Sequence, residues 1–177
     1  MILVIAATEH ELSAGGDGLV CGIGPELAGR ETARALAERR PGAVLHVGIA
    51  GARRASGVPL LQAVIGAASV DCDGRGDELA PDVRLLAAAR RALPGAALLP
   101  IGTAATIGGT TGVPVEAMEG HAVLAACSEA GVPALEVRVV STEIEEADRA
   151  RWRFAEGFAE VRRVTALLVP ALEEALA

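Results

Sequence analysis

Two carboxylates, Glu9 and Glu11, follow directly after the apolar run of residues 2–7. A run that is apolar throughout is typical of a strand covered on both faces, so these side chains stand at the carboxyl end of a buried strand. A carboxylate beside an apolar cleft can act as a general base if its pKa is raised. The plainer interpretation is a solvated turn, and the spacing alone leaves both open.

A second pair of carboxylates, Glu116 and Glu119, stands where a short strand gives way to a helix that begins near Gly120. An ionised carboxylate offers two acceptor oxygens and can bind two vicinal hydroxyls. The plainer interpretation is a helix N-terminal acid that the helix dipole favours. We interpret the nearby His121 as an ordinary helix-start histidine. No His and Glu residues have metal-ligand spacing, so we expect no metal and no cofactor.

Two glycine-containing segments, residues 22–24 and 48–51, are interpreted as strand-to-helix turns. The first lacks the third glycine of the dinucleotide fingerprint, and the chain contains no lysine for a Walker motif. Both segments therefore indicate tight turns or another kind of small-molecule site. The charged segment 148–152, which holds the one Trp, is interpreted as a solvated helix turn with a packed Trp152.

Short apolar runs alternate with longer helix-like segments, which predicts an α/β fold with a largely parallel sheet in a single domain, residues 1–177. The expected strands are residues 2–7, 43–47, 58–70, 97–101 and 133–140, and the expected helices are residues 25–39, 81–93, 120–130 and a long amphipathic helix that closes the chain. Such sheets bind ligands in loops at the carboxyl ends of their strands. Four loop segments are therefore expected to form the site: residues 8–11, 48–52, 103–109 and 141–146.

The composition bounds the class of protein. The 177 residues are 51% apolar and 22% charged, with a net charge of −7, which is typical of a globular protein and argues against nucleic acid as a partner. The longest apolar stretch, about residues 57–70, is too short to span a membrane, and the N-terminus indicates a strand rather than a signal peptide. The three cysteines are widely spaced, so we expect neither disulfides nor a zinc site. This pattern favours a cytoplasmic location.

Taken in order, these pieces resemble the nucleoside phosphorylase / methylthioadenosine nucleosidase superfamily. Its most specific marker is a Met-Glu-Gly element before a helix, here Met118 to Gly120, followed by a strand that ends in Ser141. Within the superfamily the chain is most similar to the futalosine hydrolases of menaquinone biosynthesis. The segments that carry the resemblance are residues 2–11, 22–25, 47–52, 103–109, 115–120, 137–141 and 146–152.

The resemblance implies a mixed, largely parallel sheet flanked by helices, in a shortened version of the nucleoside phosphorylase fold. It also implies roles on the sugar side of a nucleoside. Glu11 aligns with the carboxylate that activates water for attack at the anomeric carbon of ribose. Glu119 aligns with the carboxylate that binds the ribose hydroxyls, and Met118 with the side chain that packs against the sugar.

On the base side, the resemblance implies that Ile49 and Gly51 line the site and that Ile107 lies beside the purine. Ser141 and Thr142 occupy the positions of the pair that handles purine N7, which makes Thr142 the second expected catalytic position. The resemblance implies an Asp or Asn at the position where this chain has Thr142. Because a threonine hydroxyl donates one hydrogen bond but is no general acid near neutral pH, Glu143 or Glu145 is an alternative source of the proton, and the sequence leaves the choice open.

The nucleophile is decided by the residues that would bind an oxyanion. The superfamily's phosphorylases have an Arg and a Ser where this chain has His46 and Ile49. An isoleucine side chain offers no donor to phosphate, so we expect water to be the co-substrate.

The resulting prediction is a purine nucleosidase that hydrolyses the N-glycosidic bond of futalosine, or of aminodeoxyfutalosine, and releases hypoxanthine or adenine. The alternatives are a catalytically weakened nucleoside-binding relative and a methylthioadenosine/S-adenosylhomocysteine nucleosidase. The expected partners are a small nucleoside, water and further copies of the chain, as a homodimer or a higher homo-oligomer.

Overall fold

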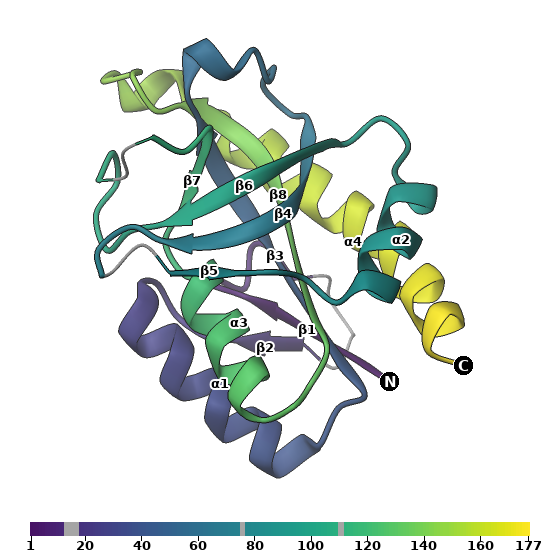
Figure 1. Cartoon of the computed structure of the whole chain (residues 1–177). Coiled ribbons are helices and arrows are strands. Elements are labelled where there is room, and N and C mark those ends of the chain that lie inside the picture. Colours follow the sequence, from purple (N-terminus) through teal and green to yellow (C-terminus); the bar gives the residue numbers. More distant parts are fainter. Residues whose placement is uncertain (13–17, 75–76, 110–111) are drawn as a thin grey trace.

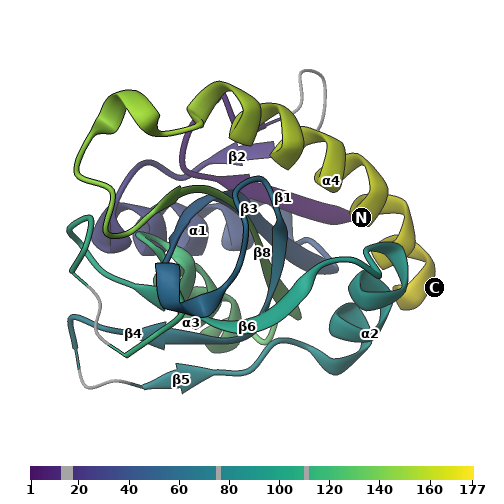
Figure 2. The same cartoon turned by 90° about the horizontal axis from the view of Figure 1, so that it is seen from above.

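One mixed sheet holds the strands of the computed structural model, which describes residues 1–12, 18–74, 77–109 and 112–177 (Figures 1 and 2). Within these residues the strands are β1 (Ile2–Ala6), β2 (Gly18–Val20), β3 (Ala43–Ala52), β4 (Ala63–Asp71), β5 (Glu78–Leu79), β6 (Ala97–Thr103), β7 (Val115–Ala117) and β8 (Ala134–Glu143). The α-helices are α1 (Pro25–Arg39), α2 (Val83–Ala92), α3 (Gly120–Glu129) and α4 (Phe154–Leu176), and two short 3₁₀ turns cover Arg54–Ser56 and Arg149–Arg151. The α/β prediction is confirmed.

The strand pairing closes part of the sheet into a ring. β3 pairs with β8 and β7, β8 also pairs with β4, and β6 joins β4 to β7. The pairs β1–β2, β1–β3, β3–β8, β4–β6 and β6–β7 are parallel, whereas β3–β7, β4–β5 and β4–β8 are antiparallel. The sheet is therefore mixed and largely parallel, as predicted.

Helices cover both faces of this sheet. On one face α2 and α4 pack through Leu85 and Leu168 against Leu45 and Val47 of β3. On the other face α1 and α3 pack against β1, and Leu36 and the neighbouring helix residues close a second apolar cluster. Each large aliphatic side chain buried in this way contributes about 1.5–3 kcal/mol, so the helices hold the strands, and the loops at their ends, in fixed positions.

The structure corrects three details of the sequence-based prediction. Residues 48–51 are not a strand-to-helix turn, because β3 continues through them and pairs with β8 on one side and β7 on the other. Residues 58–62 are not strand, since the chain turns there with Leu61 at a φ of 67°. The short strands β2 and β5 have no periodicity of their own, and long-range pairing creates them.

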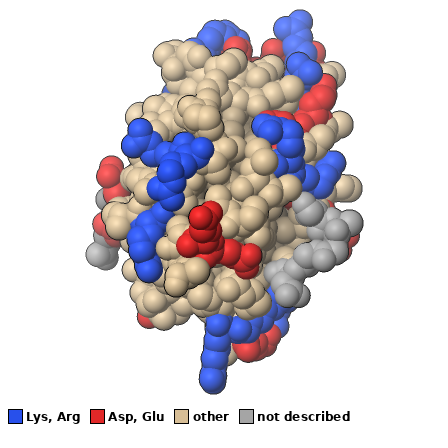
Figure 3. Space-filling model, turned by 90° about the vertical axis from the view of Figure 1, so that its right-hand side faces the viewer, with Lys and Arg blue, Asp and Glu red and all other residues tan. Residues whose placement is uncertain are grey.

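The surface of the α2 and α4 side carries charged groups of both signs within a larger area of uncharged residues (Figure 3). Among the described residues, no helix is both long and apolar enough to cross a membrane.

Candidate active site

A cavity of about 400 Å³ opens where the carboxyl ends of β1, β3 and β8 meet the loops after β6 and β7. This volume suits a small organic ligand. Each of the four predicted loop segments contributes to its wall. The eight residues predicted from the sequence all line it: Glu11, Ile49, Gly51, Ile107, Met118, Glu119, Ser141 and Thr142.

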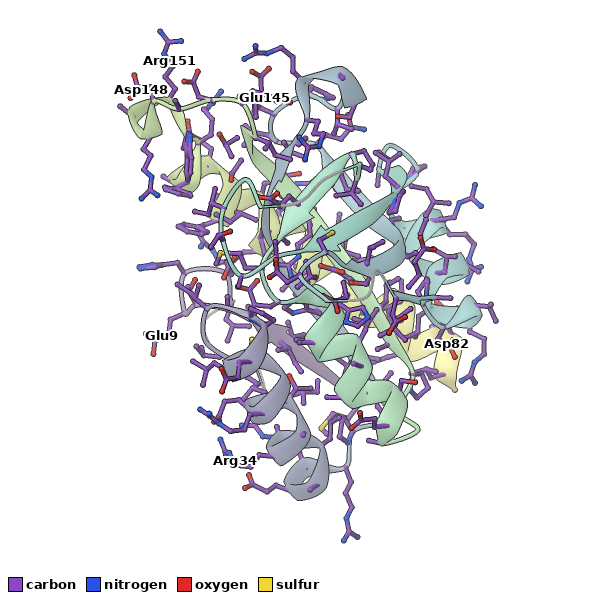
Figure 4. The ribbon with its side chains drawn as sticks, turned by 60° about the vertical axis from the view of Figure 1, so that its left-hand side comes forward. Glu9, Arg34, Asp82, Glu145, Asp148 and Arg151 are labelled. Atoms are coloured by element: carbon purple, nitrogen blue, oxygen red, sulfur yellow. The ribbon has the colours of Figure 1, made fainter. Side chains whose placement is uncertain are left out.

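Glu11 is held rigidly at the edge of this cavity and is only 3% exposed. Its Oε2 accepts hydrogen bonds from the backbone N–H of Thr8 at 3.0 Å and from the Thr8 hydroxyl at 2.9 Å. Its Oε1 accepts a hydrogen bond from the backbone N–H of Ile49 at 3.0 Å. The solvated-turn interpretation is correct for Glu9, which points away from the molecule in Figure 4, and wrong for Glu11.

Glu119 stands at the N-cap of α3, yet its side chain makes no capping hydrogen bond. Instead, Oε1 accepts a hydrogen bond from the backbone N–H of Gly24 at 3.1 Å, and Oε2 lies 3.6 Å from Nη2 of Arg138. Burial raises the pKa of the Glu119 carboxyl, and the positive charge of Arg138 opposes this rise. Glu119 therefore stands at the helix N-terminus, as the plainer interpretation expects, but its side chain turns from the helix into the cavity wall.

Glu116 also faces the cavity, from β7, and its carboxylate accepts a hydrogen bond from the backbone N–H of Gly108. This bond ties the loop that carries Ile107 to the strand that leads to Glu119. His121 is a helix-start residue, as predicted, and its backbone N–H donates to the hydroxyl of Thr103 at 2.8 Å.

A β-bulge brings Ser141 and Thr142 to the same cavity wall. In the β3–β8 pairing Ala50 lies opposite Val140, but Gly51 lies opposite Thr142, so Ser141 is an extra residue in β8. Successive residues of a regular strand point to opposite faces, and a bulge changes that direction locally. This is why two consecutive side chains both line the cavity.

The two acidic alternatives to Thr142 differ in position. Glu143 lines the cavity, and its carboxylate pairs with Arg54 at 2.5 Å. Glu145 instead accepts a hydrogen bond from the backbone N–H of Arg54 at 2.9 Å and projects outward in Figure 4. The hydroxyl of Thr142 itself donates to the backbone carbonyl of Glu143 at 3.1 Å.

Arg138 is a site residue that the sequence-based reasoning missed. It is 1% exposed, it borders the cavity, and its Nε donates to Oε1 of Glu136 at 2.8 Å. Burial acts to lower the pKa of Arg138, but the neighbouring Glu136 and Glu119 outweigh burial and raise it. The signal was present in the sequence, since two charged residues alternate with valines in a strand that is otherwise apolar.

His46 supports Arg138 from β3 and does not reach the cavity. Its Nδ1 lies 3.0 Å from the backbone carbonyl of Ile5, which only accepts hydrogen bonds, so Nδ1 carries the proton. Nε2 is then the acceptor for Nη2 of Arg138, at 2.5 Å. Burial lowers the pKa of His46 well below its ordinary value, and the positive charge of Arg138 lowers it further.

Gly48 allows Arg138 and Glu11 to approach β3. A Cβ at this position would overlap both the guanidinium Nη1 of Arg138 and Oε1 of Glu11. Only a glycine therefore lets a cationic group and an acidic group share this edge of the cavity.

Aromatic rings form the outer wall of the cavity. Trp152, Phe154 and Phe158 all line it, and Trp152 is fixed by a hydrogen bond from Nε1 to the carbonyl of Glu146 at 3.0 Å. Ring centroids are 5.5 Å apart for Trp152–Phe154 and 6.0 Å apart for Phe154–Phe158. The interpretation of residues 148–152 as a solvated turn with a packed Trp152 holds, since Asp148 and Arg151 project outward (Figure 4) and Trp152 packs against Phe154. It missed that Trp152 also lines the cavity.

In the described part of the chain, no three His, Cys, Asp or Glu residues are placed to hold a metal ion. What the site offers is a small cavity with three carboxylates held by backbone N–H groups (Glu11, Glu116 and Glu119), one buried arginine and an aromatic wall. This arrangement can bind a polyhydroxylated ring and stabilise positive charge that develops on it.

Comparison with solved structures identifies this class of fold. A 5′-methylthioadenosine/S-adenosylhomocysteine nucleosidase from Colwellia psychrerythraea, in complex with adenine, superimposes with a TM-score of 0.85 over 97% of this chain and 95% of that chain, at 18% identity. The futalosine hydrolase of Helicobacter pylori superimposes with a TM-score of 0.84 over 96% of this chain and 97% of that chain, at 14% identity. The fold is thus that of the nucleoside phosphorylase / methylthioadenosine nucleosidase superfamily.

Sequence comparison gives the family. A futalosine hydrolase from Streptomyces coelicolor is 34% identical over 94% of this chain and 83% of its own length. No protein-family model matches the chain. On this similarity the chain belongs to the futalosine hydrolase family of the nucleoside phosphorylase / methylthioadenosine nucleosidase superfamily.

Proposed function

We propose that this protein hydrolyses the N-glycosidic bond of futalosine, or of aminodeoxyfutalosine, in menaquinone biosynthesis, and that it does so in the cytoplasm. The observation that carries the proposal is the pair Glu11 and Glu119, two buried carboxylates that line one cavity together with Arg138. The similarity to the Streptomyces coelicolor futalosine hydrolase supports the choice of nucleoside.

In the proposed reaction a bond forms between a water oxygen and C1′ of ribose while the bond from C1′ to the purine N9 breaks. The bonding electrons leave with the purine, and C1′ acquires positive, oxocarbenium-like character. Glu11 takes the proton from the water. Its orientation by Thr8 and Ile49 supports this role, because a general base must be held within hydrogen-bond reach of the proton that it removes.

Glu119 is proposed to bind the ribose hydroxyls. Gly24 and Arg138 hold its carboxylate in place, and the neighbouring Met118 lines the cavity where the sugar would pack. A negative charge close to C1′ also stabilises the developing positive charge.

The purine is proposed to lie between Ile107 and the bulged segment of β8. Ser141 and Thr142 offer hydroxyls there, and Glu143 is the acidic side chain of that segment on the cavity wall. The proton that the departing base needs would come through one of these groups. Of the two acidic alternatives, Glu143 lines the cavity and Glu145 does not, but the Glu143 carboxylate would have to leave its pair with Arg54 to supply a proton.

Water rather than phosphate is proposed as the nucleophile. The backbone N–H of Ile49, a donor that an oxyanion would need, is already bonded to Glu11. His46 lies at the position where the phosphorylases of the superfamily have Arg. It is buried behind Arg138 and is not among the residues that line the cavity.

The test is incubation with futalosine, aminodeoxyfutalosine, methylthioadenosine and inosine, each with and without phosphate, followed by measurement of the free base. Release of hypoxanthine or adenine from the first two supports the proposal. Preferential cleavage of methylthioadenosine would favour the alternative nucleosidase.

A catalytically weakened nucleoside-binding relative is the second candidate. The observation in its favour is that the Thr142 hydroxyl donates to the protein's own backbone. Nucleoside binding without any release of base would support it.

We also propose a homodimer or higher homo-oligomer, with a sedimentation experiment at micromolar concentration as the test.

A further inference from the structure

We propose that Glu136 is a positioning residue for this reaction: it holds the guanidinium of Arg138 so that the opposite edge of that group faces Glu11 and Glu119. The proposal rests on the nucleosidase function proposed above, and it adds to that function a residue that lies outside the cavity.

Glu136 is buried in β8, 1% exposed, and both of its carboxylate oxygens are used. Oε1 accepts the hydrogen bond from Nε of Arg138 at 2.8 Å, and Oε2 accepts one from the hydroxyl of Ser69 in β4 at 2.8 Å. Glu136 does not line the cavity, whereas Arg138 does. Glu136 can therefore act on a ligand only indirectly, through its hydrogen bond to Arg138 and through the effect of its charge on Glu119.

The fold makes room for this carboxylate at the start of α3. Gly120 is the first residue of that helix, and a Cβ on it would overlap the whole carboxylate of Glu136. Gly120 is therefore required for packing: because it has no side chain, a carboxylate from β8 can approach the helix N-terminus. The helix dipole favours negative charge there.

The distances show how the guanidinium is divided between its partners. Nε pairs with Glu136 at 2.8 Å, and Nη2 contacts His46 at 2.5 Å, but the contact between Nη2 and Glu119 is 3.6 Å. The tight contacts lie behind Arg138 and the loose one faces the cavity. Because Glu136 neutralises Arg138 from behind, Glu119 keeps an oxygen available for a ligand.

Without the charge of Glu136, the strongest remaining attraction on Arg138 comes from Glu119 and Glu11. The guanidinium is then expected to close on Glu119 and to compete with the ribose hydroxyls for it. The charged groups around Glu119 are Arg138 and Glu136 on β8 and Glu11 after β1. The thiol of Cys21 also lies nearby, but it stays neutral because burial raises its pKa to about 12.

The experiment compares wild-type protein with Glu136→Gln, which keeps the shape and removes the charge. We expect kcat to fall about 10- to 100-fold, because a small displacement of the groups around the reacting atom has that effect. We also expect the acidic limb of the pH–rate profile to move about one pH unit lower, because removing a nearby negative charge lowers the pKa of the remaining carboxyls.

Two further variants separate positioning from mere packing. Ser69→Ala removes the hydrogen bond to Oε2 of Glu136 but leaves the ion pair with Arg138, so kcat and the pH limb should stay within about twofold and about 0.2 unit of wild type. Glu136→Asp restores the charge and should return the pH limb toward its wild-type position. If Glu136→Gln fails to fold by circular dichroism, Gly120→Ala, which displaces the same carboxylate without changing its charge, should lower kcat by a similar factor.

Carboxyl titration by ¹³C NMR makes the inference independent of turnover. A buried glutamate should titrate at lower pH in Glu136→Gln than in wild type. In Ser69→Ala the same glutamate should titrate at the wild-type pH. If wild-type protein cleaves no nucleoside, the proposed function is wrong, and this titration still decides whether Glu136 acts on the site. Wild-type kcat, an unmoved pH limb and unmoved carboxyl titrations in Glu136→Gln, with only a lower melting temperature, would overturn the inference.

Discussion

The carboxylate of Glu11 occupies the backbone N–H of Ile49, 38 residues further along the chain, at 3.0 Å. This bond joins the loop after β1 to the middle of β3. It fixes the proposed general base, and it also engages a backbone donor on the cavity wall that an oxyanion could otherwise use. One hydrogen bond thus bears on both the mechanism and the choice of nucleophile.

Glu11→Gln should reduce turnover by about 10²–10⁴-fold, because the amide cannot take the proton from water. Nucleoside affinity should stay near the wild-type value, since the shape is retained and the amide oxygen can still accept the Thr8 hydrogen bonds; the amide NH2 cannot accept the one from Ile49. Base release and calorimetric binding measure the two effects separately. Glu9→Gln, on an exposed side chain two residues away, is the matched control. Wild-type turnover in Glu11→Gln would contradict the mechanism.

Glu119→Gln should weaken nucleoside binding by about 1.5–3 kcal/mol, the effect of losing a hydrogen bond to a charged group, and should slow turnover as well. The physical reason is that this carboxylate is proposed to hold the ribose hydroxyls before and during the reaction. The affinity is measured by titration calorimetry with an unreactive analogue of the nucleoside that the protein cleaves. Glu129→Gln at the exposed end of α3 serves as the control, and unchanged affinity in Glu119→Gln would rule out the proposed role.

Phosphate should neither accelerate base release nor appear in the product. The reasons are the occupied N–H of Ile49 and the apolar side chain beside it. Chromatography of the sugar product with and without phosphate checks this expectation. A ribose-1-phosphate-type product would show that the protein is a phosphorylase.

Gly48→Ala should reduce turnover by about 10²-fold or more and should destabilise the fold by about 1–3 kcal/mol. The added Cβ would overlap Arg138 and Glu11, and neither can move without breaking buried contacts. Chemical denaturation and base release measure the two changes. Gly95→Ala, where the Cβ meets open space, should change neither.

The stability of the protein should fall on acidification below the ordinary pKa of His46, 6.5. Because the folded-state pKa of His46 is lowered, the unfolded chain binds its proton first, and acid therefore favours unfolding. The loss amounts to about 1.4 kcal/mol per pH unit, from pH 6.5 down to the folded-state pKa. Glu119 has the opposite sign, since its folded-state pKa is raised.

Comparing wild type with His46→Gln isolates the contribution of His46, because Glu119 is common to both proteins. Urea denaturation between pH 5 and pH 7.5, roughly the range in which histidine changes charge, should show the steeper acid loss in wild type. Parallel curves for the two proteins would mean that His46 is not buried as a neutral ring.

The alternation of strands and helices, and the loops that form the site, could be inferred from the amino-acid pattern alone. Apolar runs such as residues 2–7 predict buried strands, and parallel strands place their carboxyl ends together. The motif around Met118, Glu119 and Gly120 carries the family resemblance. The eight expected site residues do line one cavity, although their roles and the single-domain organisation remain predictions.

The pairing of the buried charges, by contrast, could not be inferred before the elements were placed in space. In the sequence, Glu136 and Arg138 are two charged residues in an otherwise apolar strand. In the fold, their partners come from other elements: His46 from β3 and Ser69 from β4. At the start of α3, Gly120 leaves room for the carboxylate. The bulge at Ser141 could not be predicted from the sequence either, because a residue is extra only in comparison with the strand that it pairs with, here β3. Local patterns determine where a strand begins and ends, but partners brought from distant parts of the chain determine which polar groups meet, since buried charges are stabilised by specific contacts rather than by local propensity.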